Sequence, residues 1–428
     1  MSKEFITLEE RQRIRDTRNA TRERRKTQVI KVFELKVNCH HTSKETFETL
    51  NSYFKQAKWI YNDMLAYSET QDIFDYKYTE HREVSRFDKD KNKIIEKLDI
   101  PSVYHRRLIV QLKTNITNLS KAKKKGKKIG KLKYVSEIKS IPIITGYTKI
   151  KNKRHITIPG FKNLTVYGLE QLNKYQKYEL AEGRLIKRPD GYFVKIAVCI
   201  DKDALESKKT YKEVGLDFGV KISVTTSDGK KFDCNVRESE QLKYLQKHLH
   251  RKQKGSKRYY KLLKQIRCEY QHLTNKRNDA CNKIISYLKS NYDIIYFQDE
   301  MVKAWHKGKH SKKTGRKCGY SMGKKIQHSI LGRLKTQLQM LQSEGKAFMI
   351  SKNLPTTKFC PNCGNLNQLT LADRVYTCSC GYSEDRDIHA AKNIKMFGST
   401  KRAECLEQAS AETSSSTSQS LNRDLLCK

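Results

Sequence analysis

The sequence has few acidic residues for the number of bases that it carries. Its 428 residues include 46 Asp and Glu against 88 Lys and Arg, which leaves a formal net charge of +42. This excess is far more than solubility needs, and it indicates a polyanionic partner such as nucleic acid. The 23 Tyr and 14 Phe residues provide material for packed cores, so we do not expect a disordered polycation.

Long apolar runs are absent as well. No run approaches the ~18–20 residues of a transmembrane helix, and residues 1–26 are charged throughout, unlike a secretory signal. A P-loop is also missing, because Gly323, Lys324 and Lys325 lack the Ser or Thr and the glycine spacing of that motif. We therefore expect a cytoplasmic protein with no membrane partner and no P-loop ATPase activity, and the basic charge favours association with the nucleoid.

Twelve cysteines are present, but eight of them are scattered singly, as in a cytosolic protein with reduced thiols. The other four form a cluster, in which the C-x-x-C pair Cys360 and Cys363 precedes the C-x-C pair Cys378 and Cys380 by fourteen intervening residues. Two thiolate pairs at this spacing suit tetrahedral Zn2+. Four sulfur ligands leave no position for water, so the pattern predicts a structural zinc. The second pair is one residue shorter than the usual knuckle.

The periodicity of the apolar residues predicts a multidomain fold that joins an α+β part to an α/β part. A basic arm precedes a β-rich body, which we expect to form a small barrel with a helical insert that starts at a Thr42–Glu45 capping box. The predicted parts are residues 1–27 (arm), 28–42 with 135–212 (barrel), 43–134 (helical insert), 213–355 with 384–400 (α/β domain), 356–383 (cysteine segment) and 401–428 (disordered tail).

Three acidic residues occupy distinctive places in the predicted α/β domain. Asp217 lies on a strand, Glu300 follows the buried strand 294–297, and Asp387 lies in the first turn of a helix. Each alone is a weak signal, because a strand Asp can face water, strand ends are commonly solvated, and a first-turn Asp can cap its helix.

Small residues flank two of these acids. We expect Gly215 and Gly219 to leave open space around Asp217 for a phosphate or a metal ion. Ala390, Ala391 and Ile394 give the helix of Asp387 a small-residue face, which permits close approach to a sheet.

Together, Asp217, Glu300 and Asp387 have the chemistry of a two-metal nuclease. Phosphodiester cleavage needs carboxylates that hold two Mg2+ ions roughly 3.5–4 Å apart, and such hard cations prefer oxygen ligands. Gln298 and Glu300 share one face of their strand and Asp299 has the other. We choose Glu300 as the second acid, with Asp299 as the alternative.

Two segments are rich in bases and contain no acid. Lysines with interleaved aromatic residues suit phosphates and stacked bases, although a solvated face and a surface loop are the respective alternatives. The candidate nucleic-acid-binding residues are Lys121, Lys123, Lys124, Lys125, Lys127, Lys128, Lys303, Trp305, Lys307, Lys309, Lys312, Lys313, Arg316 and Lys317.

In their order along the chain, these motifs resemble the RuvC-type nuclease of the TnpB family, and the related miniature type V-F CRISPR effectors. The motifs are Gly-Leu-Asp-Phe-Gly at 215–219, Gln-Asp-Glu at 298–300, the four-cysteine ribbon and Asp-Arg-Asp-x-x-Ala-Ala-x-Asn-Ile at 385–394. Residues 57–62 and 326–332 also look like this family, so the resemblance covers most of residues 28–400.

The resemblance implies an RNA-guided DNA endonuclease that binds a guide RNA and cuts double-stranded DNA beside a short target-adjacent motif. It implies a wedge barrel with a helical recognition domain, then a RuvC domain of RNase H fold with an inserted zinc-ribbon target-nucleic-acid-binding domain. By motif, Asp217, Glu300 and Asp387 take the catalytic Mg2+ positions. The relatives act as monomers or as asymmetric homodimers on one RNA.

This sequence departs from the family pattern in two further places. His389 stands where the family usually has Asn, and in one register Gln298 aligns with the family's Glu. Two other functions stay open: an RNA-guided repressor without catalysis, and a transposase that joins DNA strands, because RNase H-fold transposases use similar carboxylates. The motifs do not separate a transposon protein from a CRISPR effector.

Overall fold

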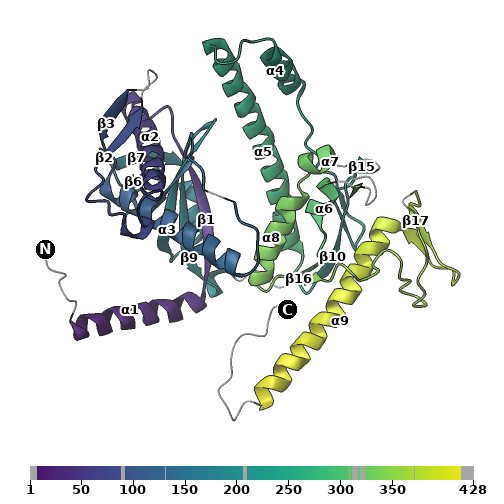
Figure 1. The fold of residues 1–428 in the computed structure, drawn as a ribbon. Coiled ribbons are helices and arrows are strands. Elements are labelled where there is room, and N and C mark those ends of the chain that lie inside the picture. The colour runs from purple at the N-terminus through teal and green to yellow at the C-terminus, as the bar shows by residue number, and fades with distance from the viewer. Residues whose placement is uncertain are drawn as a thin grey trace. The chain divides into compact units, whose positions relative to one another are not determined.

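The computed structural model describes residues 7–87, 92–130, 132–205, 210–307, 309–310, 317–318, 323–370 and 372–415 (Figure 1). The chain divides into two compact units, residues 1–206 (unit 1) and 207–428 (unit 2). In the described ranges, no helix is both long and apolar enough to cross a membrane. A mixed α/β multidomain fold, as predicted, is confirmed.

Unit 1 is built on a seven-stranded antiparallel sheet with the order β4-β8-β9-β1-β7-β6-β5. The strands are β1 (Gln28–Val37), β4 (Ser140–Ile143), β5 (Lys149–Ile150), β6 (His155–Ile158), β7 (Phe161–Tyr167), β8 (Glu179–Arg188) and β9 (Gly191–Asp201). The N-terminal strand β1 lies inside the sheet, where it pairs with β9 from Gln28 to Lys36. In the described residues β4 and β5, at the two ends of this order, do not pair with each other. Closure into a barrel therefore stays a prediction.

The other longer elements of unit 1 are α1 (Leu8–Lys26), α2 (Lys44–Tyr67), α3 (Ser102–Lys124), β2 (Glu83–Phe87) and β3 (Lys93–Lys97), with 3-10 turns at Ile73–Asp75, Leu169–Lys174 and Asp203–Leu205. Helices α2 and α3 share one core with the sheet, in which Leu50, Ile60 and Tyr104 are fully buried. Helix α2 starts after Ser43, whose Oγ accepts a hydrogen bond from Thr46 N at 3.2 Å. The predicted Thr42–Glu45 cap is therefore wrong by one residue.

Unit 2 contains a five-stranded sheet with the order β12-β11-β10-β13-β16. Its strands are β10 (Glu213–Phe218), β11 (Val224–Thr226), β12 (Lys231–Phe232), β13 (Ile294–Gln298) and β16 (Ala347–Ile350). Strands β10, β13 and β16 run parallel, whereas β11 and β12 extend the sheet as antiparallel neighbours. The carboxyl ends of β10 and β13, where Asp217 and Glu300 lie, therefore meet at one edge of the sheet.

Helices cover both faces of this sheet. The helices of unit 2 are α4 (Glu240–His250), α5 (Lys257–Asn291), α6 (Val302–Lys307), α7 (Gly323–His328), α8 (Leu331–Ser343) and α9 (Arg386–Ser415), and its further strand pairs are β14 (Lys309–His310) with β15 (Lys317–Cys318), and β17 (Val375–Thr377) with β18 (Ser383–Asp385). On β13, Ile295 and Phe297 face the core with α5 and α8, whereas Tyr296 packs with Ile394 of α9.

Helix α9 is longer than the sequence predicted. The α/β domain was expected to end at residue 400, but α9 continues to Ser415 (Figure 1). Residues 416–428 of the predicted tail lie outside the described residues. Since residues 401–415 still contain several helix formers such as Ala, Glu and Arg, they extend the helix in spite of their low apolar content.

Two glycines mark close backbone contacts instead of open space. A Cβ atom added at Gly215 would lie 2.0 Å from the carbonyl oxygen of Ala391, because α9 crosses β10 at this point. A Cβ atom at Gly219 would lie 2.5 Å from the carbonyl oxygen of Ile222. The expectation that both glycines leave room around Asp217 is wrong, whereas the predicted small-residue face of the helix is confirmed, with Ala390 and Ala391 buried.

Candidate active site and cysteine cluster

Asp217 lies on β10, between two residues of the unit 2 core. Leu216 and Phe218 are buried on the side of α5 and α8, so the side chain of Asp217 points to the opposite face and is half-buried. Burial, the largest cause, and the negative charges of Asp387 and Glu300 together raise the pKa of Asp217 from its ordinary 3.8 to about 8. The structure thus brings the three predicted carboxylates close enough to repel one another.

Glu300 follows the end of β13. The contacts of Gln298, Asp299 and Glu300 distinguish these three candidates for the second acidic position. Gln298 is buried and satisfied: its Nε2 donates to Ser351 O at 3.1 Å and to Leu354 O at 3.0 Å, and its Oε1 accepts from Thr356 Oγ1 at 3.0 Å. These hydrogen bonds hold the loop after β16 against the end of β13, so the side-chain amide of Gln298 has a structural role.

Asp299 and Glu300 differ in their surroundings. Asp299 is paired with Lys335 Nζ, which also donates to the backbone oxygen of Glu300 at 2.8 Å. Burial raises the pKa of Glu300 against the opposing charge of Lys335, and Glu300 is the one of the two whose charge acts on Asp217. This arrangement favours Glu300 over Asp299 as the second acid.

Asp387 lies in the first turn of helix α9, where the side chain of Asp385 caps its backbone N–H group. The Oδ1 atom of Asp385 accepts from the backbone N–H groups of Asp387 at 3.0 Å and Ile388 at 3.2 Å. Asp385 therefore fills the capping role that was the structural alternative for Asp387. The Asp387 carboxylate is half-buried, and its Oδ1 lies 3.7 Å from Arg386 Nε.

A hard cation fits the chemistry of these three acids. Their mutual repulsion and burial hold a proton on Asp217, and a divalent cation would replace that proton with more positive charge. Among the described residues, however, the cysteines are the one set of three or more potential ligands whose donor atoms all lie within 4.8 Å of one another. Glu300 and Asp387 are thus close enough to act on Asp217, without the tight clustering of the thiols.

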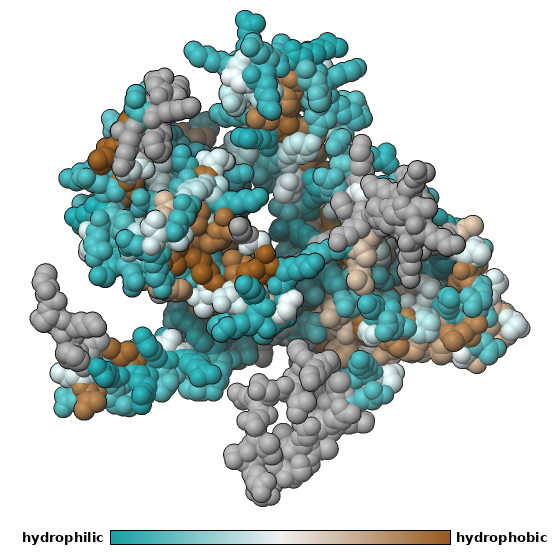
Figure 2. All heavy atoms as spheres, in the orientation of Figure 1, coloured by the Kyte–Doolittle hydropathy of each residue, from teal (hydrophilic) through white to brown (hydrophobic). Residues whose placement is uncertain are grey.

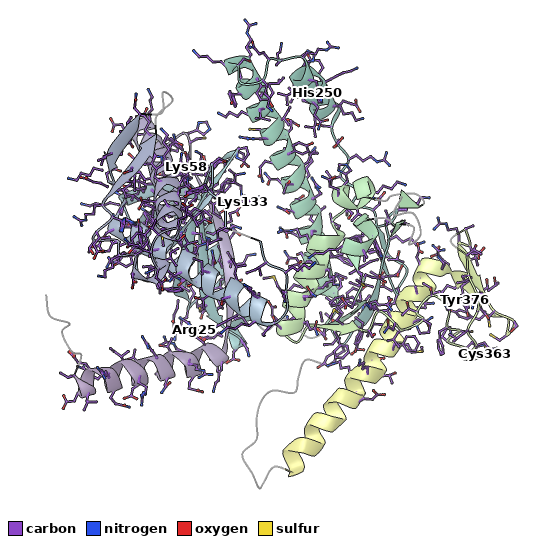
Figure 3. All side chains as sticks on the ribbon, in the orientation of Figure 1. Arg25, Lys58, Lys133, His250, Cys363 and Tyr376 are labelled. Atoms are coloured by element: carbon purple, nitrogen blue, oxygen red, sulfur yellow. The ribbon has the colours of Figure 1, made fainter. Side chains whose placement is uncertain are left out.

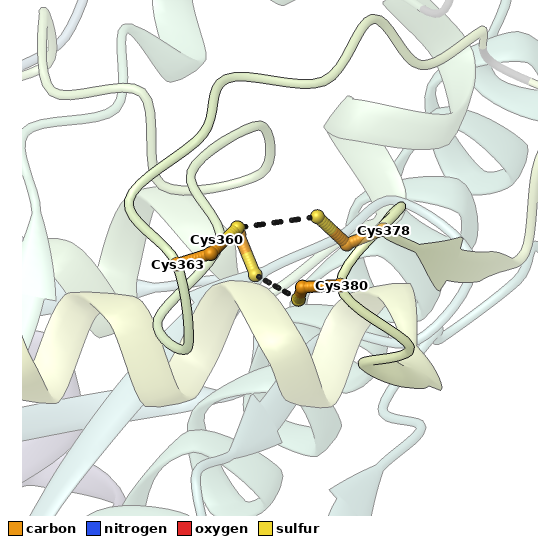
Figure 4. Close-up of side chains that lie close together, drawn as sticks. All are labelled: Cys360, Cys363, Cys378 and Cys380. Atoms are coloured by element: carbon orange, nitrogen blue, oxygen red, sulfur yellow. Dashed lines mark hydrogen bonds between the residues drawn. The ribbon is translucent and has the colours of Figure 1, made fainter.

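The four cysteines lie together as predicted (Figure 4). The Sγ atoms of Cys360 and Cys380 are 3.6 Å apart, and those of Cys363 and Cys378 are 3.5 Å apart. Sulfur atoms bound at about 2.3 Å to one tetrahedral zinc are separated by roughly 3.8 Å, so both pairs fit the same ion, including the short C-x-C half. The cluster is compatible with structural zinc.

Hydrogen-bond donors prepare two of these sulfurs for a metal. The backbone of Cys380 and the side chain of Asn367 lower the pKa of the Cys378 thiol to about 6. The side-chain amide of Asn362 donates to Cys380 Sγ at 3.4 Å and lowers the pKa of that thiol too. Since zinc binds the thiolate form, these contacts favour metal binding at neutral pH.

Helix α9 holds the cysteine segment against unit 2. The ring of His389 is buried and stacks on Tyr376, with 3.7 Å between ring centroids. The side-chain amide of Asn393 donates to the backbone oxygens of Thr356 and Phe359, each at 2.8 Å. Figure 3 shows Tyr376 and Cys363 in the small hairpin region beside the start of α9. The departure at His389 thus serves packing between α9 and the cysteine segment.

The predicted nucleic-acid-binding residues have different outcomes. The six lysines at 121–128 are all exposed, on the last turns of α3 and just after it. Lys303 is exposed, whereas Trp305 is half-buried and packs against the unit 2 core; base stacking by Trp305 stays a prediction. Lys312, Lys313 and Arg316 lie outside the described residues, as do the side chains of Lys307, Lys309 and Lys317.

Two basic residues near the acids, Arg386 and Lys335, were not identified as part of the site from the sequence. Arg386 lowers the pKa of Asp217 against the effects of burial, and Lys335 makes the contacts described above. A signal for Lys335 was available: it lies four residues after Leu331 and three before Leu338, within the buried stripe of α8. A lysine inside an apolar stripe indicates a buried acidic partner.

Comparisons with known proteins agree with these features. The family model described as "Probable transposase" matches residues 195–299, and that described as "Cas12f1-like, TNB domain" matches residues 332–394. A protein of Streptomyces pristinaespiralis named "Putative RNA-guided DNA endonuclease" is 27% identical over 195 residues, which are 44% of this chain and 46% of that protein. "TnpB-like protein L79" of Acanthamoeba polyphaga mimivirus is 30% identical over 146 residues, which are 34% of this chain and 27% of that protein.

The matches are partial in length. The chain spans about half of the first of these relatives, at 46%. A chain from a solved Cas12f1–sgRNA–target DNA complex aligns with 86% of this chain and 99% of its own length, at 15% identity and a TM-score of 0.25, which is too low to establish a shared fold. The family models and the named relatives nevertheless confirm the resemblance to the TnpB family that the motifs indicated.

Proposed function

Starting from a chain that resembles the TnpB family, we propose that this protein is an RNA-guided DNA endonuclease. The proposal rests on the proximity of Glu300 and Asp387 to Asp217, because their negative charges, together with burial, raise the pKa of Asp217. In this proposal, unit 2 is a RuvC domain with a zinc-ribbon target-nucleic-acid-binding domain at the cysteine cluster. Unit 1 holds the wedge barrel and the recognition helices.

The three carboxylates would hold two Mg2+ ions. When bound, such ions supply a water of lowered pKa and neutralise the charge of the leaving oxygen. The residues of the chain have supporting roles: Lys335 binds Asp299 and orients the backbone of Glu300, while Gln298 fixes the end of β13 to the loop after β16. Arg386 offsets part of the negative charge around Asp217.

The choice between the two strand-end acids has a direct test. We expect Glu300→Gln to lower cleavage of guided target DNA by about 10²-fold or more, the loss typical of removing one stabiliser of developing charge. Asp299→Asn should cost less than about tenfold, because its carboxylate binds Lys335. The measurement is single-turnover cleavage in Mg2+ with the protein's own guide RNA, with RNA affinity as the control. If Asp299→Asn alone were inactive, Asp299 would be the ligand.

The description "Probable transposase" for residues 195–299 favours a second function, in which the same carboxylates join DNA strands. The products separate the two functions. An endonuclease leaves free ends at a site set by the guide RNA, whereas a transposase yields covalently joined strands without one. Incubation of labelled target with and without guide RNA, followed by denaturing electrophoresis, distinguishes them.

The exposed lysines of residues 121–128 are proposed to contact phosphates. Changing Lys123, Lys124, Lys125, Lys127 and Lys128 to Ala should reduce the slope of log affinity for RNA against log[salt] by roughly three to five units, since each phosphate contact contributes about 0.7–0.9. The target sequence that is cut should not change, because guide pairing reads it. Lys→Arg changes at the same positions keep the charge and serve as the control. An unchanged slope in the Ala variant would identify a merely solvated face.

A further inference from the structure

Helix α1 is unusual because it buries nothing. It runs for 19 residues from Leu8 to Lys26, and none of its side chains is buried. Its start is fixed by a capping box between Thr7 and Glu10, and its end is tied to unit 1, because Arg24 and Arg25 contact Glu179 at 3.1 and 2.9 Å. Figure 3 shows Arg25 at the end of α1 next to the sheet.

The arginines of α1 are arranged along one face. Arg11, Arg15, Arg18 and Arg22 follow one another at steps of four, three and four residues, which places them on one side of a helix. At 1.5 Å per residue, the stripe is about 16 Å long. All four side chains are exposed, and in the described structure no hydrogen bond or ion pair is found for their guanidinium groups.

The acids of α1 lie away from this stripe. Glu9, Asp16 and Glu23 repeat every seven residues, and these three acids and Glu10 are turned by about 110–150° from the arginines, at 100° per residue. Two of them have partners on their own side, since Asp16 accepts from Gln12 at 2.9 Å and Glu23 accepts from Lys26. The arginine charge is therefore not neutralised within the helix.

Such a helix lacks the usual source of stability. Helices in proteins gain most of their stability from packing an apolar face against the rest of the fold, and α1 has no buried face. Leu8 and Ile14 are the large apolar residues of α1, and they are 83% and 41% exposed, too few and too separated for an apolar partner. The view of α1 in Figure 2 is accordingly dominated by hydrophilic residues. The charge pattern calls for a polyanion.

We propose that the stripe of Arg11, Arg15, Arg18 and Arg22 binds the phosphate backbone of a double-helical segment of RNA, and that this contact stabilises α1. Arginine is suited to this role because its planar guanidinium binds phosphate through two hydrogen bonds. The inference rests on the proposed function, in which the RNA is the guide. An RNA that stays bound can support α1 permanently, whereas target DNA is present only during cleavage.

The first test uses the full chain and a synthetic 24-base-pair RNA hairpin, since backbone contacts require no particular sequence. Changing the four arginines to Gln should reduce the salt slope of RNA binding by about three units. Arg13→Gln, on the opposite face, should leave it unchanged, and the melting temperature of the free protein should not move, because α1 is not part of the core. An unchanged slope in the fourfold variant would overturn the inference.

The second test separates the helix from its charge. Ala20→Pro breaks α1 on the face opposite the stripe and keeps every arginine. It should weaken RNA hairpin binding by at least about tenfold, if the pre-arranged stripe matters more than the charge alone. Trypsin should cut wild-type α1 rapidly in free protein and slowly with the RNA hairpin bound.

Two results of the second test would contradict the RNA assignment. Equal binding by Ala20→Pro and wild type would show that the helical arrangement of the arginines does not matter. Equal protection of α1 by RNA and by a DNA duplex of the same sequence would show that the stripe does not select RNA. These readouts do not involve cleavage. Failure of guided cleavage by the wild-type protein would reject the proposed function, whereas the hairpin experiments report on α1 alone.

Discussion

Asp217→Asn is expected to reduce guided DNA cleavage by about 10²–10³-fold or more, while leaving RNA affinity nearly unchanged. Asn keeps the size of Asp217 but cannot ionise to the carboxylate that a hard divalent cation prefers as a ligand. If these residues hold cations that neutralise charge in the transition state, no other group at this point can replace it. The measurement is single-turnover cleavage with saturating guide RNA over a range of Mg2+ concentrations.

The same variant should be as stable as the wild type, or more stable, in the presence of a chelator. The folded protein keeps a proton on Asp217 up to about pH 8, whereas an unfolded chain releases it near pH 3.8. The free energy of unfolding of the metal-free wild type therefore loses this contribution as the pH rises between these values. Asp217→Asn has no such proton to release, so its stability should fall less over this range.

Chemical denaturation at pH 5 and pH 8.5 in chelator checks this expectation. A variant that is inactive but equally stable has lost chemistry and not its fold. Cleavage near the wild-type rate would reject the assignment of unit 2 as a RuvC nuclease. Loss of RNA binding together with cleavage would mean that Asp217 supports the fold. The same assay excludes the catalytically inactive repressor if the wild-type protein cuts DNA.

Much of the site could be predicted because its residues lie on regular elements. Alternation of apolar residues placed Asp217 on a strand and Glu300 at a strand end, and the alanines of α9 predicted close packing. The parallel pairing of β10 with β13, which brings the two acids to one edge, is a long-range contact. Local periodicity does not encode this pairing, so the prediction that the three acids come together rested on their combined chemistry as metal ligands.

The errors came from contacts between segments that are distant in sequence. Gly215 was expected to leave space, but α9 fills it from more than 170 residues later. The role of Gln298 was ambiguous because its hydrogen-bond partners, Ser351, Leu354 and Thr356, lie in the loop after β16, more than 50 residues later. Trp305, which is predicted to stack on bases, also packs against the unit 2 core. In each case, residue type alone does not show which distant segment returns to cover it.

Loss of the cysteine cluster is expected to have the second large effect. Cys360→Ser should reduce zinc from one ion per chain to near zero after mild chelation, because Cys360 is a fully buried member of the four ligands and three ligands hold zinc far more weakly than four. Elemental analysis of purified protein measures this. Cys39→Ser, which changes an exposed cysteine outside the cluster, is the matched control.

The consequence for activity follows from how the cluster is attached. Asn393 binds the backbone of Thr356 and Phe359, and His389 stacks on Tyr376, so the cysteine segment packs against the same helix that carries Asp387 in its first turn. Loss of zinc should loosen the hairpin and, through α9, the position of Asp387. We therefore expect Cys360→Ser to lower guided cleavage by at least about tenfold, the loss typical of residues that orient catalytic ligands, and to change RNA affinity by less than about twofold. If elemental analysis found no zinc in the purified wild-type protein, the cluster would not be a zinc site. If a zinc-free variant cut target DNA at the wild-type rate, the cluster would not support the active site.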